Sequence, residues 1–178
     1  MTTFMFKRSW RKILLAIALL FTATIAVAGW YWIYFSMSAA RPFEVNDPRS
    51  SPRVLIATQG SEFKDAVVAG VVDHLKARAI YVKVIDVAAL PGVNAGEWNA
   101  IVLVHTWEMR KPPKEVKALV DRAGNSGKLV VLTTSGAGIF KMDGVDAMSS
   151  ASVVAEAPSR AADIAAKVDA ILRTGVEK

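Results

Sequence analysis

The sequence predicts an α/β domain with a parallel sheet, preceded by one apolar helix long enough to cross a membrane. Short runs of apolar and β-branched residues alternate with segments of helical periodicity, which is typical of a parallel sheet with helices on both faces. Small and polar residues follow the apolar runs, as in loops at the carboxyl ends of strands. Near the N-terminus, residues 13–35 carry no charged side chain.

Residues 13–36 are predicted to be a transmembrane helix. At 1.5 Å per residue the uncharged run reaches about 34 Å, against a hydrocarbon core of about 30 Å. Aromatic residues lie at both ends, with Trp10 at one and the run from Trp30 to Phe35 at the other, as at headgroup boundaries. A cleavable signal peptide is the alternative, because residues 24–28 are small at suitable spacing. The apolar run continues past them, which favours a retained signal anchor.

Basic residues predict the orientation of this helix. Residues 1–12 form a basic tail with Lys7, Arg8, Arg11 and Lys12, whereas basic residues beyond the helix are spread among acidic ones. The positive-inside bias places the tail in the cytoplasm and the C-terminal domain outside the inner membrane, in the periplasm. Membrane lipid is therefore a predicted partner. Small residues on the helix leave two roles open, a simple tether or packing against other membrane-protein subunits.

Residues 37–52 have no hydrophobic period and are predicted to be a linker. Residues 53–178 are enough for one domain. The chain carries +6 in total, but from Met37 onward 18 basic residues against 16 acidic ones leave only +2. This balance argues against a nucleic-acid partner. The absence of cysteine excludes disulfides, thiolate metal sites and cysteine nucleophiles.

The first half of the domain is predicted as strand, helix, strand, strand. The strands are 54–57, 80–87 and 101–104. The helix between the first two has an apolar stripe, with Lys64 off that stripe; the stripe residues are Phe63, Val67, Gly70, Val71 and Leu75.

The second half begins with a helix around residues 116–120, opened by two prolines. A fourth strand at 129–132 and a fifth within 145–154 follow, and Pro158 starts a closing helix. Between residues 138 and 145 there is too little chain for an ordinary helix, so a loop is predicted.

The order of these elements from residue 53 to about residue 172 resembles the flavodoxin-like family. The resemblance implies a doubly wound parallel sheet of about five strands in the order 2-1-3-4-5. In that family one loop wraps the FMN phosphate, a second carries an aromatic ring that stacks on the flavin, and a third closes the other side. The corresponding residues are Thr58, Gly60 and Ser61, then Thr106 and Trp107, then Ser135 and Gly136.

The resemblance is weaker at the phosphate loop. Glu62 and Asp65 begin the helix where a phosphate dianion would lie, and they satisfy the helix dipole themselves. At 4 Å and an effective dielectric near 20, each like charge costs about 4 kcal/mol, which removes most of a micromolar affinity. A further resemblance, from Asp146 to Ser152, is to the acceptor motif of covalently flavinylated extracytoplasmic domains, with Ser152 in the place of the acceptor Thr.

The two histidines and the basic segment after Trp107 are not spaced along the sequence as catalytic or metal-binding residues would be. His74 is interpreted as a surface histidine, and His105 lies at the carboxyl edge of a central strand without a paired carboxylate. Two histidines and no cysteine argue against a metal site. Basic residues from Arg110 to Lys117 form either a solvated helix start or a contact for anionic lipid or an acidic subunit.

These observations predict a single-pass, membrane-anchored flavodoxin-like protein that binds no cofactor. It would act as a non-catalytic accessory or scaffolding subunit of a larger membrane assembly, such as a redox complex. The alternative is an FMN-binding electron-transfer protein that uses Trp107 and the phosphate loop. A flavin held covalently at Ser152 is a third reading.

Overall fold

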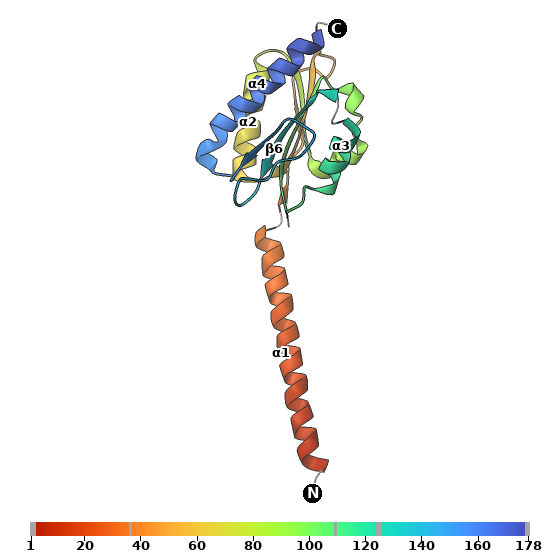
Figure 1. Cartoon of the computed structure of the whole chain (residues 1–178), viewed down its shortest axis with the longest axis vertical. Helices are drawn as coiled ribbons and strands as arrows, with labels where there is room; N and C mark the ends of the chain where they lie inside the picture. Colours follow the sequence, from red (N-terminus) through yellow and green to blue (C-terminus); the bar gives the residue numbers. More distant parts are fainter. Residues whose placement is uncertain (1–2, 36, 109, 124–125, 177–178) are drawn as a thin grey trace. The chain divides into compact units, whose positions relative to one another are not determined.

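A computed structural model describes the chain apart from residues 1–2, 36, 109, 124–125 and 177–178. The chain divides into two compact units, residues 1–36 and 37–178. The first unit is helix α1, Thr3–Phe35 (Figure 1). Within the described residues, α1 is the one helix long and apolar enough to cross a membrane, over Trp10–Tyr31 with a mean hydropathy of 2.3. Signal sequences share these properties.

The second unit is built around a seven-stranded sheet. Five of its strands run parallel, in the spatial order β4, β3, β5, β6, β7. Numbered along the chain, this order is 2-1-3-4-5, as the sequence predicts, and it defines the flavodoxin-like fold class. The five strands are β3 (Arg53–Gly60), β4 (Tyr81–Asp86), β5 (Ala100–Thr106), β6 (Leu129–Thr134) and β7 (Ala147–Ser150).

The other two strands lie within residues 37–52, the segment predicted to be a linker, and they bring the sheet to seven strands where about five were predicted. Strand β1, Ser38–Ala39, pairs antiparallel with the end of β3. Strand β2, Phe43–Val45, pairs antiparallel with β4 at the edge of the sheet. Strands of two or three residues are too short to show a period, and their pairing is set by distant partners.

Helices cover both faces of the sheet, with α2 and α4 on one face and α3 on the other (Figure 1). The bounds are α2 Glu62–Lys76, α3 Lys114–Ala123 and α4 Ala157–Val176, with short 3-10 helices η1 Val87–Gly92, η2 Ala95–Glu97 and η4 Val154–Glu156. Gly70 brings α2 close to α4, because a Cβ there would lie 2.7 Å from the Cβ of Ala161.

Side chains alternate between the two cores along each strand. Ile56 and Val102 belong to the core under α2 and α4, whereas Leu55 and Ile101 belong to the core under α3. All four are no more than 1% exposed. Burial on both faces explains why these strands are continuous apolar runs in the sequence.

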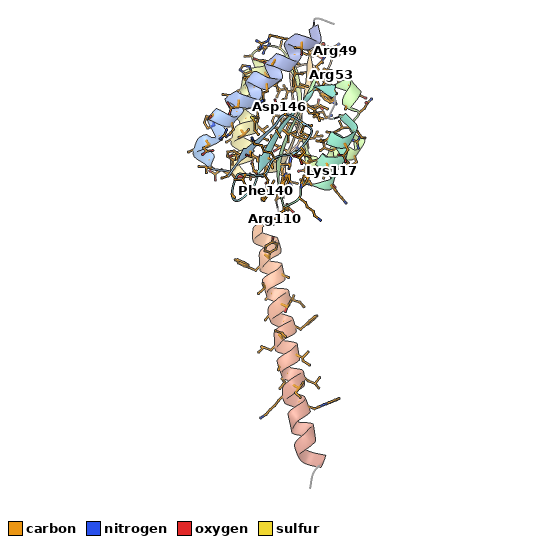
Figure 2. The ribbon with its side chains drawn as sticks, in the orientation of Figure 1. Arg49, Arg53, Arg110, Lys117, Phe140 and Asp146 are labelled. Atoms are coloured by element: carbon orange, nitrogen blue, oxygen red, sulfur yellow. The ribbon has the colours of Figure 1, made fainter. Side chains whose placement is uncertain are left out.

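All five parallel strands end at the same edge of the sheet, which we call the carboxyl edge. Figure 2 shows Arg110 and Phe140 at one end of this unit and Arg49 and Arg53 at the other. No helix lies between β6 and β7 in the described residues, as predicted. Ligands of open α/β sheets bind at the carboxyl edge, which directs attention to the loops after β3, β5 and β6.

Candidate functional site

The sheet brings the residues predicted for a flavin phosphate to the carboxyl edge. Thr58 and Gly60 are buried at the end of β3. Ser61 is the N-cap of α2, and its hydroxyl accepts a hydrogen bond from the Lys64 backbone N–H at 3.3 Å. This is ordinary capping of a helix by serine. Capping therefore already uses the Ser61 hydroxyl.

Residues 37–40, which we call the strap, cross the end of β3 at this point. In β1, Ser38 lies opposite Gly60 and Ala39 opposite Gln59. The Ser38 hydroxyl donates to the Gly60 carbonyl at 2.9 Å, and the Ala40 N–H donates to the Asp86 carboxylate at 2.7 Å. The strap therefore pairs with the strand end that the resemblance assigns to the FMN phosphate.

Gly60 makes this approach of the strap possible. A Cβ built on Gly60 would lie 2.6 Å from the Ser38 Oγ and 3.0 Å from the Ala39 carbonyl oxygen. Contacts under 3.0 Å require something to shift, so any larger residue at position 60 would push against the strap. The glycine that the sequence offers as a phosphate contact here serves a close backbone approach.

Lys64 lies beneath the strap. Its side chain is 1% exposed, and its ammonium donates to the Thr106 Oγ1 at 2.9 Å and to the Met37 Sδ at 3.2 Å. Both partners are neutral. Burial lowers the pKa of Lys64 to about 8, an effect that the nearby Asp65 and Glu108 charges oppose. The sequence placed Lys64 off the apolar stripe of α2, and the structure corrects this to a buried cation.

A network of hydrogen bonds connects the ends of β3, β5 and β6 around this lysine. The Gln59 Oε1 accepts from the Thr106 N–H at 2.8 Å, and the hydroxyls of Thr106 and Thr134 lie 2.8 Å apart. Thr58 is 2% exposed, and its hydroxyl donates to the Gln59 carbonyl at 3.1 Å. The hydroxyls of Thr58 and Ser61, which the resemblance assigns to a phosphate, are thus bonded to backbone groups, and the Thr106 hydroxyl is bonded to Thr134 and to the Lys64 ammonium.

Trp107 lies on the other side of the sheet edge and stacks on Phe140. The two ring centroids are 5.1 Å apart and the planes differ by 5°. Carbon atoms in contact lie about 3.5–4 Å apart, so a third ring between these two would need planes separated by about 7 Å or more. The aromatic ring predicted to stack on a flavin therefore stacks on a side chain of its own chain, and no isoalloxazine fits between them as they lie.

His105 lies on the end of β5, two positions before Trp107. It is fully buried, its Nε2 lies 3.5 Å from the Thr133 hydroxyl, and its Nδ1 has no hydrogen-bond partner. Burial lowers the pKa of His105 to about 4, opposed by a backbone hydrogen bond with Thr106 and assisted by the Lys64 charge. The imidazole is therefore neutral at pH 7. The Trp107 Nε1 is likewise buried without a partner.

The remaining predicted residues lie in loops at the same edge. The Ser135 hydroxyl accepts from the Gly138 N–H at 3.0 Å, which closes a tight turn, and Gly136 is exposed. Ser152 follows β7 with a φ of 60° and is exposed. Its N–H donates to the Ser150 hydroxyl at 3.3 Å. His74, interpreted as a surface residue, lies half-exposed 3.0 Å from the Asp169 carboxylate.

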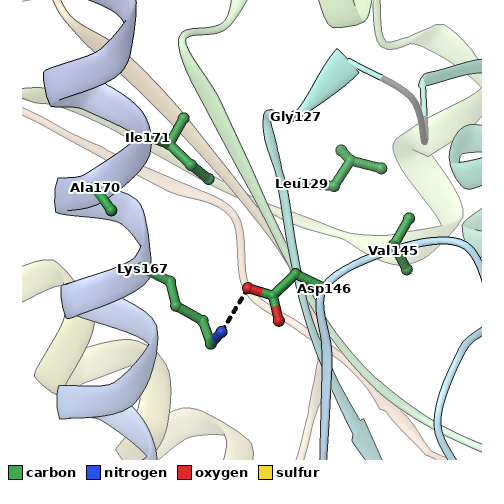
Figure 3. Close-up of a pocket in the computed structure, with 7 residues that line it drawn as sticks. All are labelled: Gly127, Leu129, Val145, Asp146, Lys167, Ala170 and Ile171. Atoms are coloured by element: carbon green, nitrogen blue, oxygen red, sulfur yellow. Dashed lines mark hydrogen bonds and ion pairs between the residues drawn. The ribbon is translucent and has the colours of Figure 1, made fainter.

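Two hollows in the described part of the second unit bear on the site. A groove of about 700 Å³ borders the strap, between it and α2, with Thr58, Gly60 and Asp65 in its wall. A cavity of about 320 Å³ lies beside α4 (Figure 3), where Lys167 and Asp146 form an ion pair among mainly apolar residues; its lining comprises Gly127, Leu129, Val145, Asp146, Lys167, Ala170 and Ile171. Of these two, the groove adjoins the predicted site.

Charges at the site differ from those that the sequence suggests. Glu62 is exposed in the first turn of α2, so solvent screens its predicted repulsion of a phosphate. The buried charge is Lys64, which is positive. Among the described residues, no cluster of three or more His, Cys, Asp or Glu side chains is arranged to hold a metal.

The fold is of the flavodoxin-like class, and the strap together with the stacked Trp107 and Phe140 occupies part of its carboxyl edge. No protein family model matches the chain, and no curated protein matches it. Among solved structures, it is similar to an oxidoreductase from Corynebacterium diphtheriae, with a TM-score of 0.46, 14% identity, and coverage of 72% of this chain and 100% of that one. It is also similar to a flavodoxin, WrbA-like protein from Agrobacterium tumefaciens, with a TM-score of 0.42, 12% identity, and coverage of 68% and 98%.

Sequence reasoning missed Met37, Gln59 and Phe140, and misplaced Lys64. A lysine one position after Phe63 lies at the boundary of the apolar stripe of α2, where periodicity alone does not decide between core and solvent. Phe140 stands in a loop without a period, so only the requirement that an exposed indole find a partner could have indicated it.

Proposed function

We propose that the chain is a single-pass membrane protein whose extracytoplasmic flavodoxin-like domain acts as a non-catalytic accessory subunit and holds no FMN in the folded state described here. One observation carries the proposal. Both halves of the position that FMN occupies in the family are filled from within, by the strap over Lys64 and by Phe140 on Trp107. A domain that keeps the fold but closes the ligand site can still bind partner subunits through its surface, which is the role proposed here.

The membrane anchor in this proposal rests on α1. Its apolar span from Trp10 to Tyr31 exceeds the about 20 residues that a hydrocarbon core requires. Large side chains on the helix, such as Leu15 and Leu19, are at least 70% exposed, as expected of a surface that faces lipid or another helix. The basic tail before it supports a cytoplasmic N-terminus.

The visible absorption spectrum of the purified full-length protein tests the absence of flavin. We expect no flavin band, whereas a flavin content close to one per chain would contradict the proposal. Flavin that stays with the protein after acid precipitation would support covalent attachment, and loss of it in Ser152→Ala would locate the bond.

Copurification tests the accessory role. Extraction in a mild detergent should bring the tagged chain out with other membrane proteins, and a lone monomer would contradict the scaffolding idea. A control chain in which residues 13–35 are replaced by an unrelated apolar span separates partner binding by the domain from partner binding by the helix. Partners kept by this control bind the domain, and partners lost from it bind the helix.

The second candidate is an FMN-binding electron-transfer protein. One observation favours it: Lys64 provides a buried cation beside the N-terminus of α2, where a phosphate is attracted to both. For FMN to bind, the strap would have to leave Gly60, and Phe140 would have to leave Trp107. The residues that would then hold it are Thr58, Gly60, Ser61, Thr106, Trp107, Ser135 and Gly136.

A further inference from the structure

We propose that the loops after β5 and β6 form a docking surface for the anionic phospholipid headgroups of a bilayer. This surface, which we call the lipid patch, comprises the exposed side chains of Arg110, Lys111, Ile139 and Lys141. The inference rests on the proposed function, because it names the partner of a domain that is anchored to a membrane. Three features support it: the packing that joins the loops, their charge, and the edge at which the chain enters the domain.

The Trp107–Phe140 stack joins the two loops. The ring centroids lie 5.1 Å apart, and Trp107 follows β5 whereas Phe140 follows β6. Two backbone hydrogen bonds between Glu108 and Lys111, at 3.0 and 2.9 Å, close a tight turn directly after Trp107. Arg110 lies in this turn with a φ of 61°. The stack therefore holds the turn and the residues around Phe140 at one end of the unit, where Figure 2 shows Arg110 and Phe140.

Ile139 gives the lipid patch an apolar side chain. It is 70% exposed, whereas the next most exposed large apolar side chains in the described part of the second unit, Val153 and Phe43, are 46% and 44% exposed. Exposed apolar side chains among basic ones are typical of surfaces at headgroup level, where the apolar group enters the boundary with the acyl chains and the cations meet lipid phosphates. This combination favours a bilayer over an acidic protein segment, which would use the charges alone.

The charge of the two loops is positive. Residues 107–114 and 135–143 carry four basic side chains and two carboxylates. In the part of the chain that the structure describes, no carboxylate forms an ion pair with Arg110, Lys111 or Lys141, and all three side chains are exposed. Exposed cations without a carboxylate partner are attracted to a surface of negative charges.

The two carboxylates of these loops offset the cations only in part. Burial lowers the pKa of Lys64, and the Asp65 and Glu108 charges oppose this effect, so the Glu108 charge is shared with a buried ammonium. Asp143 is exposed two positions after Lys141. A surplus of positive charge therefore remains on the lipid patch.

The chain enters the second unit at the same edge of the sheet. Met37 is the first residue of this unit, and its Sδ accepts hydrogen bonds from the Lys64 ammonium at 3.2 Å and from the Thr106 hydroxyl at 3.4 Å. Thr106 ends β5, directly before Trp107. The apolar helix that the proposed function assigns to the bilayer ends at Phe35, two positions before Met37. The covalent chain therefore attaches the membrane anchor to the edge that carries the lipid patch.

Quenching of a fluorescent label by lipid tests the proposal in the full-length protein reconstituted in vesicles. Because the chain has no cysteine, Ala137→Cys, at an exposed position in the loop after β6, can carry a single label. Asp73→Cys, near the C-terminal end of α2, carries the control label. The vesicles are phosphatidylcholine, alone or mixed with phosphatidylglycerol, and both kinds contain a lipid with a nitroxide on its headgroup as the quencher.

We expect the label at position 137 to be quenched roughly threefold more strongly in the vesicles with phosphatidylglycerol, because the cations of the lipid patch are attracted to the anionic surface. High salt should reduce this difference, since it screens exposed charges. The label at position 73 should not respond to lipid charge.

Two triple variants separate the lipid patch from basic residues in general. Each replaces three exposed basic side chains by glutamine, in the patch or at the C-terminal ends of three helices. The patch variant should lose the difference between the vesicles and the control should keep it: these are Arg110→Gln/Lys111→Gln/Lys141→Gln and Lys76→Gln/Arg122→Gln/Arg173→Gln. Ile139→Ser should weaken the quenching. Circular dichroism checks that each variant is folded.

Two results would overturn the inference: equal quenching of the label at position 137 in the two kinds of vesicle, or an unchanged difference in the folded patch variant. An acidic protein as the true partner would give the first result. Release of the full-length protein from the vesicles by alkaline extraction would instead contradict the membrane anchor of the proposed function. The dependence of quenching on lipid charge can be read in either case, because it requires only that protein and vesicles are mixed.

Discussion

The two halves of the filled edge are closed in different ways. At the phosphate half, a short backbone segment lies over a buried cation and is held by hydrogen bonds. At the ring half, Phe140 stacks on Trp107, and His105, two positions before Trp107, is buried. Hydrogen bonds to a solvent-exposed segment exchange readily with water, whereas apolar stacking does not. The comparison teaches that the phosphate half is closed mainly by hydrogen bonds and the ring half mainly by aromatic stacking.

The largest expected effect concerns His105 in the ring half. Its pKa is lowered to about 4, so between pH 4 and 6.5 the unfolded state binds more protons than the folded state. Stability contributed by the neutral imidazole is present above pH 6.5 and is lost as the pH falls toward 4. We expect a loss of about 3 kcal/mol across this range, since one pKa unit corresponds to about 1.4 kcal/mol.

Chemical denaturation of the full-length protein in detergent at several pH values measures this loss. His105→Gln, which cannot be protonated, should remove most of the pH dependence in that window. His74→Gln is the control, because His74 is half-exposed. If the free energy of unfolding of His105→Gln fell with pH as steeply as that of the wild type, the stability of the ring half would not depend on a neutral imidazole.

The second prediction concerns Lys64 in the phosphate half. Its folded-state pKa of about 8 lies below the ordinary value of 10.5, so the folded state loses its proton first as the pH rises. Folding stability should therefore increase between pH 8 and 10.5. Lys64→Met removes the buried charge together with its two hydrogen bonds to neutral partners, and we expect it to raise the free energy of unfolding at pH 7 by about 2 kcal/mol.

Denaturation of Lys64→Met at pH 7 and at pH 10 checks this expectation. The gain should shrink at the higher pH, where the wild-type lysine is already neutral. Lys76→Met, at the exposed end of α2, is the matched control and should change stability little at either pH. Destabilisation by Lys64→Met at pH 7 would mean that the ammonium is well satisfied under the strap.

The smallest effect is expected from Phe140 in the ring half. Phe140→Ala removes a stacked ring that is only half-buried, so we expect a loss of about 1–2 kcal/mol. Tryptophan fluorescence should shift toward longer wavelength as Trp107 meets water. Ile139→Ala, at a side chain that is 70% exposed, is the neighbouring control. Equal effects of the two changes would contradict a closed aromatic stack.

The sequence predicts the sheet well because its central strands are buried on both faces. Val54 to Ala57, Ile101 to Val104 and Leu129 to Leu132 are continuous apolar runs, and the alternation with helical segments leads to a parallel sheet. The order of these strands follows from the resemblance to a fold class, which the structure confirms.

The closure of the site could not be predicted in the same way. The strap pairs through two residues, Ser38 and Ala39, whose partners lie 22 and 20 positions along the chain, and short segments of this kind carry no period. Lys64 is a charged residue in the core, which propensity places at the surface. Trp107 was identified as a stacking residue, but its partner Phe140 depends on the course of an irregular loop.

The most direct test of the claim that the domain excludes FMN measures the flavin spectrum of the wild type and of a variant in which both closures are removed. The wild-type protein, purified after growth with excess riboflavin, should show no flavin band, and neither should it after incubation with FMN. Gly60→Ala combined with Phe140→Ala should gain FMN binding if the two closures are what exclude it. Wild-type protein that carries or takes up FMN near one per chain would contradict the account.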